Sequence, residues 1–395
     1  MLKDWRHTPA VRRILAQGPL ARTHLEFVVD LCDWLCQRGL PLYRVNQYTP
    51  TLHPLMQGVG AVWRRDGRHS EEIQPHWREN EGDPGWLASP LRKIMLGTEE
   101  IRVDLTEGPA EFGVPILDRL RAEGASEYLV MAVPFADRRR SAVSWATDAP
   151  GGFSVRARNE LRNLAGPIGL VLDLLEWRRT ASTLLDTYLG RGPGRLVLDG
   201  AIRRGDHRNI EAVILFADLR DFTSRAMRST SAQLLAVLDA YFQVLVGAVT
   251  AAGGEVLKFM GDGLLAIFPI GTEHTVDQTC IRALDATIAA QQQMAELNRS
   301  RVEAGSSVLA FGVGLHVGEV VYGNIGGRGR LDFTVIGRAV NLVSRVEGLC
   351  KTLDQTVLAT DTFAHHLGPR MVSVGRHAIR GLADPVELYA LPDVP

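Results

Sequence analysis

The stretch that decides the fold runs from residue 212 to residue 223 and reads AVILFADLRDFT. Its apolar run ends abruptly in Asp218, which places a carboxylate where a buried strand meets solvent. A second stretch, residues 255–268, reads EVLKFMGDGLLAIF and holds Asp262 in a Gly-Asp-Gly turn that bends the backbone tightly. The two patterns predict neighbouring strands whose ends carry a pair of carboxylates.

This pair of aspartates has the chemistry of a magnesium site. Carboxylate oxygens are hard ligands, and Mg²⁺ completes its shell with water and substrate phosphates. Two ions held side by side stabilise both the attacking and the leaving oxygen of a phosphoryl transfer. We therefore predict two-metal chemistry on a nucleotide, with Mg²⁺ or Mn²⁺ as the cofactor and two ions in each active site.

The composition is that of an ordinary globular protein. With 395 residues, 46% of them hydrophobic and 23% charged, the chain is long enough for two domains with real cores. A net charge of -1 argues against broad electrostatic binding of nucleic acid. Four cysteines do not make a disulfide framework in a chain of this length, so we expect them to be core residues.

Nothing in the sequence predicts a membrane span or a secretion signal. A spanning helix needs a run of about 18 or more apolar residues. The longest candidate, residues 164–177, is interrupted by Asp173 and Glu176. Residues 1–6 contain no apolar signal region. We therefore expect a cytoplasmic protein.

Residues 1–152 have the pattern of a small mixed domain. Helices are expected at residues 22–38 and 115–123, strands at 127–135 and 141–147, and short apolar stretches at 43–48 and 59–64. The three arginines at 138–140 are expected to form a solvated hairpin tip. This order of elements resembles the GAF sensor family, in pattern only. The resemblance implies a GAF-like sensory or regulatory domain with an unknown small-molecule or protein input.

A long helical pattern joins this region to the rest of the chain. It runs from residue 153 to residue 189 and ends where three glycines and one proline follow, and we expect a short connector at 190–209. We assign residues 153–204 as a helical dimerisation linker and connector.

The C-terminal region, residues 205–395, alternates between helices and strands in an α+β order. Helices are expected at residues 231–250, 275–303 and 338–349. Strands are expected at 211–217, 255–260, 264–268, 308–317, 320–322, 333–336, 371–377 and 386–391.

This region resembles the catalytic domain of class III nucleotidyl cyclases, on the two aspartate blocks, on DFTVIGRAVN from residue 332 and on NLVSR from residue 341. The resemblance implies a ferredoxin-like α/β sandwich that makes cyclic AMP or cyclic GMP from the triphosphate. It also implies a homodimer, because the family builds its active sites between two catalytic domains.

The resemblance implies roles for the phosphate and metal side of the site. Asp218 and Asp262 match the metal-binding aspartates, and the carbonyl of Leu219 matches a third ligand. Phe222 and Thr223 match a turn whose backbone N–H groups approach the phosphates. The family usually has Gly at position 221, and the aspartate found here is unfavourable near phosphates unless it points away.

The same resemblance implies how the purine is read. Lys258 matches a lysine that donates to adenine N1, which favours ATP over GTP because guanine N1 carries a proton. Thr334 matches a residue that accepts from the adenine amino group, more weakly than aspartate would. Threonine here is similar to the class IIIb subgroup, which implies a response to bicarbonate.

The last matching residues lie on the predicted helix 338–349. Asn341 and Arg345 are four residues apart and share one helical face. The resemblance implies that Asn341 orients the ribose, that Arg345 stabilises charge on the α-phosphate, and that Arg380 contacts the triphosphate.

Two alternatives stay open. The domain would be a guanylate cyclase if GTP were preferred, or a silent cyclase-like regulatory module if it bound nucleotide without turnover. His316, in a glycine-rich strand pattern, is expected to be a packed core histidine.

Overall fold

The computed structural model describes residues 8–52, 56–75, 84–107, 113–137 and 139–392. The N-terminal residues expected to lack a signal region, Arg138 of the predicted hairpin tip and the last three residues lie outside these ranges. The chain divides into two units, Met1–Leu184 and Leu185–Pro395, which are described separately.

The first unit is built on a six-stranded antiparallel sheet with the order β3-β2-β1-β6-β5-β4. Its strands are β1 (Arg44–Pro50), β2 (Met56–Arg64), β3 (Ser70–Pro75), β4 (Glu100–Asp104), β5 (Glu127–Pro134) and β6 (Arg140–Thr147). Side chains of β5 alternate between the two faces, as strand geometry requires. Leu129 and Met131 enter one core, and Tyr128 and Val130 enter the other.

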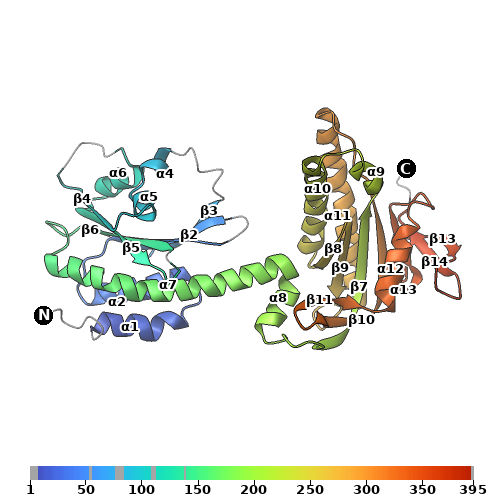
Figure 1. Ribbon diagram of the computed structural model, residues 1–395, viewed down its shortest axis with the longest axis horizontal. Coiled ribbons are helices and arrows are strands. Elements are labelled where there is room, and N and C mark those ends of the chain that lie inside the picture. Colours follow the sequence, from blue (N-terminus) through green and yellow to red (C-terminus); the bar gives the residue numbers. More distant parts are fainter. Residues whose placement is uncertain (1–7, 53–55, 76–83, 108–112, 138, 393–395) are drawn as a thin grey trace. The chain divides into compact units, whose positions relative to one another are not determined.

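Helices cover both faces of this sheet, as Figure 1 shows. One face packs against α1 (Pro9–Gln17), α2 (His24–Gln37) and α7 (Val155–Leu189), with the short η2 (Gly18–Leu20) between the first two. The other face carries α4 (Pro84–Ala88), α5 (Pro90–Met95) and α6 (Pro115–Ala122). The sheet is therefore buried on both sides.

The helices and strands predicted for the first unit are confirmed, but several elements were missed. α1, β3, β4, α4 and α5 have no counterpart in the prediction, and β1 and β2 were expected only as apolar stretches. β4 has the sequence EIRVD and is an edge strand with no fully buried residue, so it lacks the apolar run that marks a central strand. The similarity of this unit to the GAF family stays a prediction.

The prediction of a connector at 190–209 is partly wrong, because residues 191–198 form a helix. Gly190 ends α7 with a φ of 89°, and α8 (Arg191–Leu198) follows at once. Pro193 lies in the first turn of α8, where its missing N–H would have no helical acceptor in any case. Leu196 and Val197 of α8 then pack on the core of the second unit.

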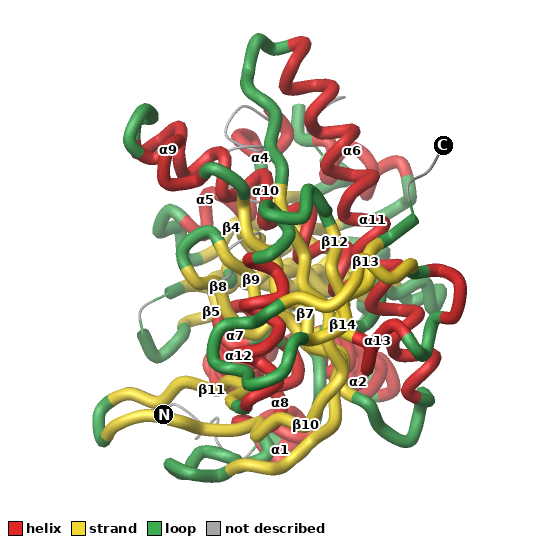
Figure 2. Tube along the Cα trace, turned by 90° about the vertical axis from the view of Figure 1, so that its right-hand side faces the viewer, coloured by secondary structure: helices red, strands yellow, loops and turns green. Residues whose placement is uncertain are grey.

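The second unit has an eight-stranded sheet with the order β13-β14-β12-β10-β7-β9-β8, and β11 pairs with the far part of β10. All neighbours are antiparallel except β10 and β12. The strands are β7 (His207–Leu219), β8 (Glu255–Met260), β9 (Gly263–Pro269), β10 (Phe311–Gly327), β11 (Arg330–Ile336), β12 (Val357–Thr360), β13 (Val372–His377) and β14 (Val386–Ala390). Figure 2 shows β10 and β11 as a two-stranded ribbon.

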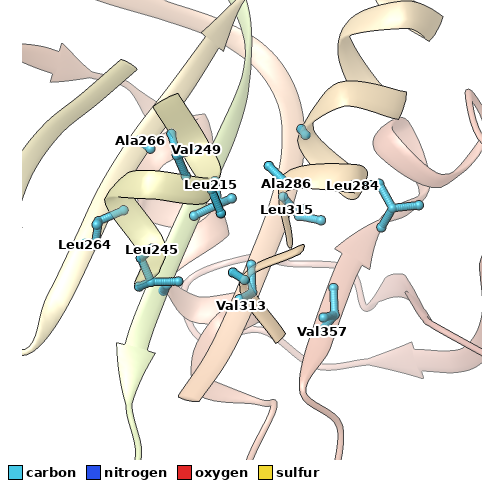
Figure 3. Packing of buried hydrophobic residues seen from close by; sticks show 14 of the residues in the cluster. Leu215, Leu245, Val249, Leu264, Ala266, Leu284, Ala286, Val313, Leu315 and Val357 are labelled. Carbon is cyan, nitrogen blue, oxygen red and sulfur yellow. The ribbon is translucent and has the colours of Figure 1, made fainter. Parts of the chain in front are cut away.

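Two long helices and one shorter helix lie on opposite faces of this sheet. α10 (Ser231–Ala251) and α11 (Val276–Glu303) pack on one face, where Leu245 and Leu284 approach the sheet residues Leu215 and Leu315 (Figure 3). α12 (Arg338–Gly348) packs on the other face through Val343. The remaining elements are short: α9 (Phe222–Ala226), α13 (Asp361–Ala364) and η3 (Gly368–Arg370).

The α+β prediction for this unit is confirmed, with local corrections. The strands expected at 308–317 and 320–322 are one strand, β10, because Gly318 and Glu319 interrupt the apolar pattern without interrupting the ladder to β7. β12, α9 and α13 were missed, and each is at most five residues long.

The most apolar helix in the described part of the chain is α10, not the predicted candidate at 164–177. By length and composition alone α10 could cross a membrane, with a mean hydropathy of 1.8 over its best window and 28% of that window buried. Val237, Tyr241 and Leu245 of α10 pack into the core of the second unit, so the helix is part of that fold.

Candidate active site

Asp218 and Asp262 are brought together by strand pairing. Asp218 is the penultimate residue of β7 and lies opposite Gly263, the first residue of β9. Asp262 directly precedes Gly263 in the β8–β9 turn, where Gly261 has a φ of +69° that favours glycine. The two carboxylates are within hydrogen-bonding contact of each other.

This proximity has an electrostatic cost. Burial, followed by the charge of Asp262 and the hydrogen bond to it, raises the pKa of Asp218 to about 6, although the N–H of Leu219 opposes the shift. Two carboxylates in contact cannot both ionise easily unless a cation lies between them. The pair therefore fits a divalent cation.

Sequence reasoning missed Glu347 of α12, which lies behind the pair. Gly312 faces Asp218 across the β7–β10 ladder, and a Cβ on Gly312 would lie 2.4 Å from Oε1 of Glu347. Burial, then the charge of Asp218, raises the pKa of Glu347 to about 7. The alternating glycines at 312 and 314 were the available signal, because they leave room on one face of β10 for α12.

Tyr241 of α10 also approaches these carboxylates. Its side chain is fully buried, and its hydroxyl has no hydrogen-bond partner among the described residues. Burial raises its pKa, and the nearby charges of Asp218, Asp262 and Glu347 raise it further.

The ligand atoms at Asp218 and Asp262 are enough for a metal ion whose remaining coordination positions are filled by substrate and water. Within the described ranges, no group of three or more His, Cys, Asp and Glu side chains is arranged to hold a metal. Mg²⁺ often needs only one or two carboxylates when phosphates and water supply the rest. Leu219 has no ligand atom in its side chain, which is buried in the core, so only its backbone carbonyl could contribute.

Phe222 and Thr223 begin α9, just beyond the end of β7. N–H groups in a first helical turn have no intrahelical acceptor, so these are free to meet an anion. Asp221 precedes them with a φ of 58°, in the left-handed region that explains why glycine is usual there. Its carboxylate lies 2.7 Å from Nζ of Lys351, which balances the charge that seemed unfavourable beside phosphates.

Lys258 is held by a residue that the sequence analysis did not consider. Its Nζ forms an ion pair with the carboxylate of Asp332, and this contact ties β8 to β11. Thr334 lies two residues further along β11, on the same face as Asp332, and is buried. The structure therefore brings Lys258 close to the Thr334 region through Asp332.

Asn341 and Arg345 are both exposed on α12. The side chain of Asn341 has no partner among the described residues. Arg345 donates from Nη1 to the backbone carbonyl of Arg380, so these two residues are neighbours, and the side chain of Arg380 is exposed.

The contacts thus sort the predicted residues into separate groups. In the part of the chain that the structure describes, no hydrogen bond or ion pair joins the Asp218–Asp262 pair to Lys258, Thr334, Asn341 or Arg345.

His316 is a packed histidine, as expected. Burial lowers its pKa to about 4, and Nδ1 lies 2.8 Å from the hydroxyl of Thr360. Cys32, Cys280 and Cys350 are buried free thiols, whereas Cys36 is only half-buried.

Comparison with known proteins identifies the class of the second unit. Residues 206–392 match the adenylate and guanylate cyclase catalytic domain. An adenylate cyclase from Anabaena cylindrica is 35% identical over 158 residues, which are 39% of this chain and 30% of that protein. The second unit therefore contains a class III adenylate and guanylate cyclase catalytic domain.

Two solved structures are similar to about half of the chain. The adenylyl cyclase CyaB from P. aeruginosa is 24% identical, with a TM-score of 0.44 over 48% of this chain and 97% of that one. The guanylyl cyclase Cya2 is 30% identical, with a TM-score of 0.42 over 49% of this chain and 96% of that one. The chain covers only 8–30% of the length of the first three curated relatives.

Proposed function

We propose that this protein is an adenylate cyclase, which converts ATP to 3′,5′-cyclic AMP and pyrophosphate in sites shared by two copies of the chain. The observation that carries the proposal is the meeting of Asp218 and Asp262 at the end of β7, in a domain of the cyclase family.

In this proposal the residues near β7 hold the metal and the phosphates. Bound Mg²⁺ or Mn²⁺ would neutralise the triphosphate and lower the pKa of the ribose 3′-hydroxyl. Asp218, Asp262 and the carbonyl of Leu219 would be the protein ligands for two ions. The N–H groups of Phe222 and Thr223 would donate to phosphate oxygens.

The remaining residues would orient the nucleotide. Asn341 would position the ribose, and Arg345 would stabilise charge on the α-phosphate, since its planar donors match a phosphoryl group. Arg380, next to Arg345, would contact the triphosphate. Lys258 would donate to adenine N1, and Thr334 would accept from the adenine amino group.

A homodimer is supported by exposed apolar side chains close to the Asp218–Asp262 pair. β8 is an edge strand, and Phe259 and Met260, just before the turn that holds Asp262, are 53% and 44% exposed. A symmetric pair of chains would contain two complete sites, each drawing metal ligands from one chain and nucleotide ligands from the other.

The rest of the chain would serve regulation. We assign residues 1–152 to a regulatory domain, 153–204 to a linker and 205–395 to the catalytic domain, in a cytoplasmic protein. The hypothesis also includes activation or inhibition by bicarbonate, which is implied by the threonine at position 334.

A second candidate is a guanylate cyclase, and the ion pair of Lys258 with Asp332 favours it. A carboxylate can accept hydrogen bonds from the N1–H and the 2-amino group of guanine. Adenine has no donor at either position. A module that binds nucleotide without turnover is less well supported, because every predicted site position holds a competent group.

The test is turnover by purified full-length protein with ATP or GTP, alone and in competition, with Mg²⁺ or Mn²⁺ and with bicarbonate varied. We expect cyclic AMP and pyrophosphate in equal amounts, and no product in EDTA. A preference for GTP would support the second candidate. A folded dimer that releases no pyrophosphate from either nucleotide would overturn both.

A further inference from the structure

The first unit contains a cavity of about 730 Å³ between the end of β1, the start of β6 and helices α4 and α5. Small-molecule sites usually have volumes of about 300–1,000 Å³ and mostly apolar walls. Tyr48 and Trp86 lie on the wall with ring centroids 5.9 Å apart, and Leu52, Met95 and Leu96 add aliphatic surface. The walls therefore suit an apolar or aromatic group.

The polar part of the lining includes three arginines, of which Arg139 pairs with Asp137 and Asp173, and Arg140 with Glu99. Arg92, Arg139 and Arg140 line the cavity, and no acidic residue lines it among those described. Arg139 and Arg140 belong to the tip that the sequence analysis expected to be solvated, but their side chains are only 31% and 34% exposed. For Arg139 and Arg140 the expectation was wrong, because both line the cavity and Arg139 also packs on Trp177 of α7; Arg138 lies outside the described residues.

Two of these guanidinium groups have unused donors. Arg140 pairs through Nη2 with Glu99 at 2.9 Å, but its Nη1 is buried with no partner in the described part of the chain. The guanidinium of Arg92, on the last turn of α5, likewise has no hydrogen-bond or ion-pair partner among the described residues. Arginine donors match carboxylates and phosphates, and buried unused donors are costly.

We propose that this cavity binds a small organic anion with an aromatic ring. The ring packs against Tyr48 and Trp86, and the carboxylate or phosphate accepts hydrogen bonds from Arg92 and Arg140. Such a ligand would be an input to the proposed regulatory domain. Binding itself does not depend on the proposed function, but any effect of the ligand on turnover rests on it.

The cavity wall is tied directly to α7. The side chain of Thr51, a lining residue, lies beside the carboxylate of Glu176, which is fully buried on α7, and opposes the rise that burial causes in its pKa. Arg139 places its guanidinium 5.6 Å from the ring centre of Trp177 on the same helix. A ligand that shifts Thr51 or Arg139 therefore acts on α7, which continues to Leu189 in the second unit.

Calorimetric titration of the full-length protein tests the ligand class without turnover. The probes are 1-naphthoate, 1-naphthyl phosphate and the neutral 1-naphthalenemethanol. At least one anion should bind at least tenfold more tightly than the neutral probe, and the better anion distinguishes carboxylate from phosphate. Failure of both anions to bind, or equal affinity for the neutral probe, would overturn the inference.

Arg92→Gln should weaken binding of the better anion about tenfold, and Arg92→Lys, which keeps the charge but not the planar donors, should weaken it less. Lys93→Gln is the matched control, because Lys93 is the exposed neighbour of Arg92 and does not line the cavity. Unchanged affinity in folded Arg92→Gln would overturn the assignment of the anion to this arginine.

Hydrogen exchange tests the tie to α7. The bound anion should slow amide exchange in residues 173–182, and Thr51→Val should reduce this effect while changing affinity less than about twofold. Equal slowing in Thr51→Val would contradict the role of Thr51. A protein that turns over ATP but binds neither anion would overturn this inference alone, whereas binding without turnover would count only against the proposed cyclase.

Discussion

At the scale of single residues, the carboxylates of Asp218 and Asp262 lie in contact and would repel each other if both were ionised. The ordinary pKa of an aspartate is 3.8, whereas burial and Asp262 raise that of Asp218 to about 6. Between these values the folded state binds more protons than the unfolded state, so the free energy of unfolding falls as pH rises through this window.

Asp218→Asn should remove the contribution of Asp218 to this dependence and leave that of Glu347, whose pKa is raised to about 7. In EDTA the variant should be more stable than the parent above pH 6, and the difference should vanish near pH 4, as measured by urea unfolding. Mn²⁺ should raise the midpoint of the parent but not of the variant, and cyclase activity should be lost. Asp239→Asn, at an exposed position of α10, is the control. Equal Mn²⁺ stabilisation of both proteins would remove Asp218 from the metal site.

Gly312 is required because Glu347 occupies the space where a side chain would lie. Gly312→Ala should destabilise the protein by about 1–3 kcal/mol in urea unfolding, because a Cβ would lie 2.4 Å from Oε1 of Glu347. Gly348→Ala, with nothing within 4 Å of the added atom, should be neutral or stabilising. Equal effects would show that α12 moves freely away from β10.

In the proposed cyclase, Asp332 would compete with the nucleotide for Lys258. Asp332→Asn should free the ammonium group and raise the ratio of kcat/KM for ATP over GTP, by up to about tenfold for an interaction change of 1.4 kcal/mol. Steady-state kinetics with both nucleotides measure the ratio, and Glu319→Gln, exposed on β10, is the control. A ratio that moves toward GTP would mean that Asp332 takes part in reading adenine.

For single residues, the sequence predicted which residue types form the candidate site and how they are spaced. It did not predict which side chains form ion pairs with them. The strand-end positions of Asp218 and Asp262 follow from an apolar run and a Gly-Asp-Gly turn. The partners of Lys258 and Asp221 could not be predicted, because Asp332 and Lys351 lie far along the chain. No local pattern encodes such contacts.

At the scale of elements, β8 leaves an apolar edge beside the metal pair. Met260→Glu should shift the protein toward monomers, seen by sedimentation velocity, and lower the specific activity most at low protein concentration. Val372→Glu places the same charge on β13, at the opposite edge of the sheet, and should leave the association unchanged. A fully dimeric Met260→Glu protein would exclude β8 from the interface.

Element prediction succeeded where one face is clearly buried. β7 and α12 have continuous apolar positions that strand and helix periods reveal. α8 was missed because glycine and proline were interpreted as breakers, although Pro193 lies in a first turn. A fragment that begins at Leu185 keeps Leu196 and Val197 on the core, whereas one that begins at 205 loses them.

At the scale of the whole molecule, the shared-site hypothesis predicts complementation. Asp262→Ala and Arg345→Ala chains should each be inactive alone, because each removes one half of every site. Mixed after dissociation, they should form heterodimers with one intact site, and recover up to about a quarter of parental activity if association is random and the sites are independent. The measurement is cyclic AMP formation against mixing ratio. No recovery in a mixture shown to contain heterodimers would place both residues in one chain's site.

The two units differ in how much of their structure and function could be predicted from the sequence. The second unit has four motif blocks that point to one family, and residues 206–392 match it. The first unit offers only an order of helices and strands. Its cavity depends on residues from β1, α5 and β6 that meet only in the fold.

The 35 residues of α7 form one unbroken helix, through Pro167, up to Gly190. At 1.5 Å per residue this is a rod of about 52 Å, and each residue turns it by about 100°. Gain or loss of a single residue within it would turn the helix residues after that point by about 100° relative to those before it, whereas a change of seven would nearly restore the phase. The faces that α7 presents at its two ends thus depend on its length with a period that its composition does not reveal.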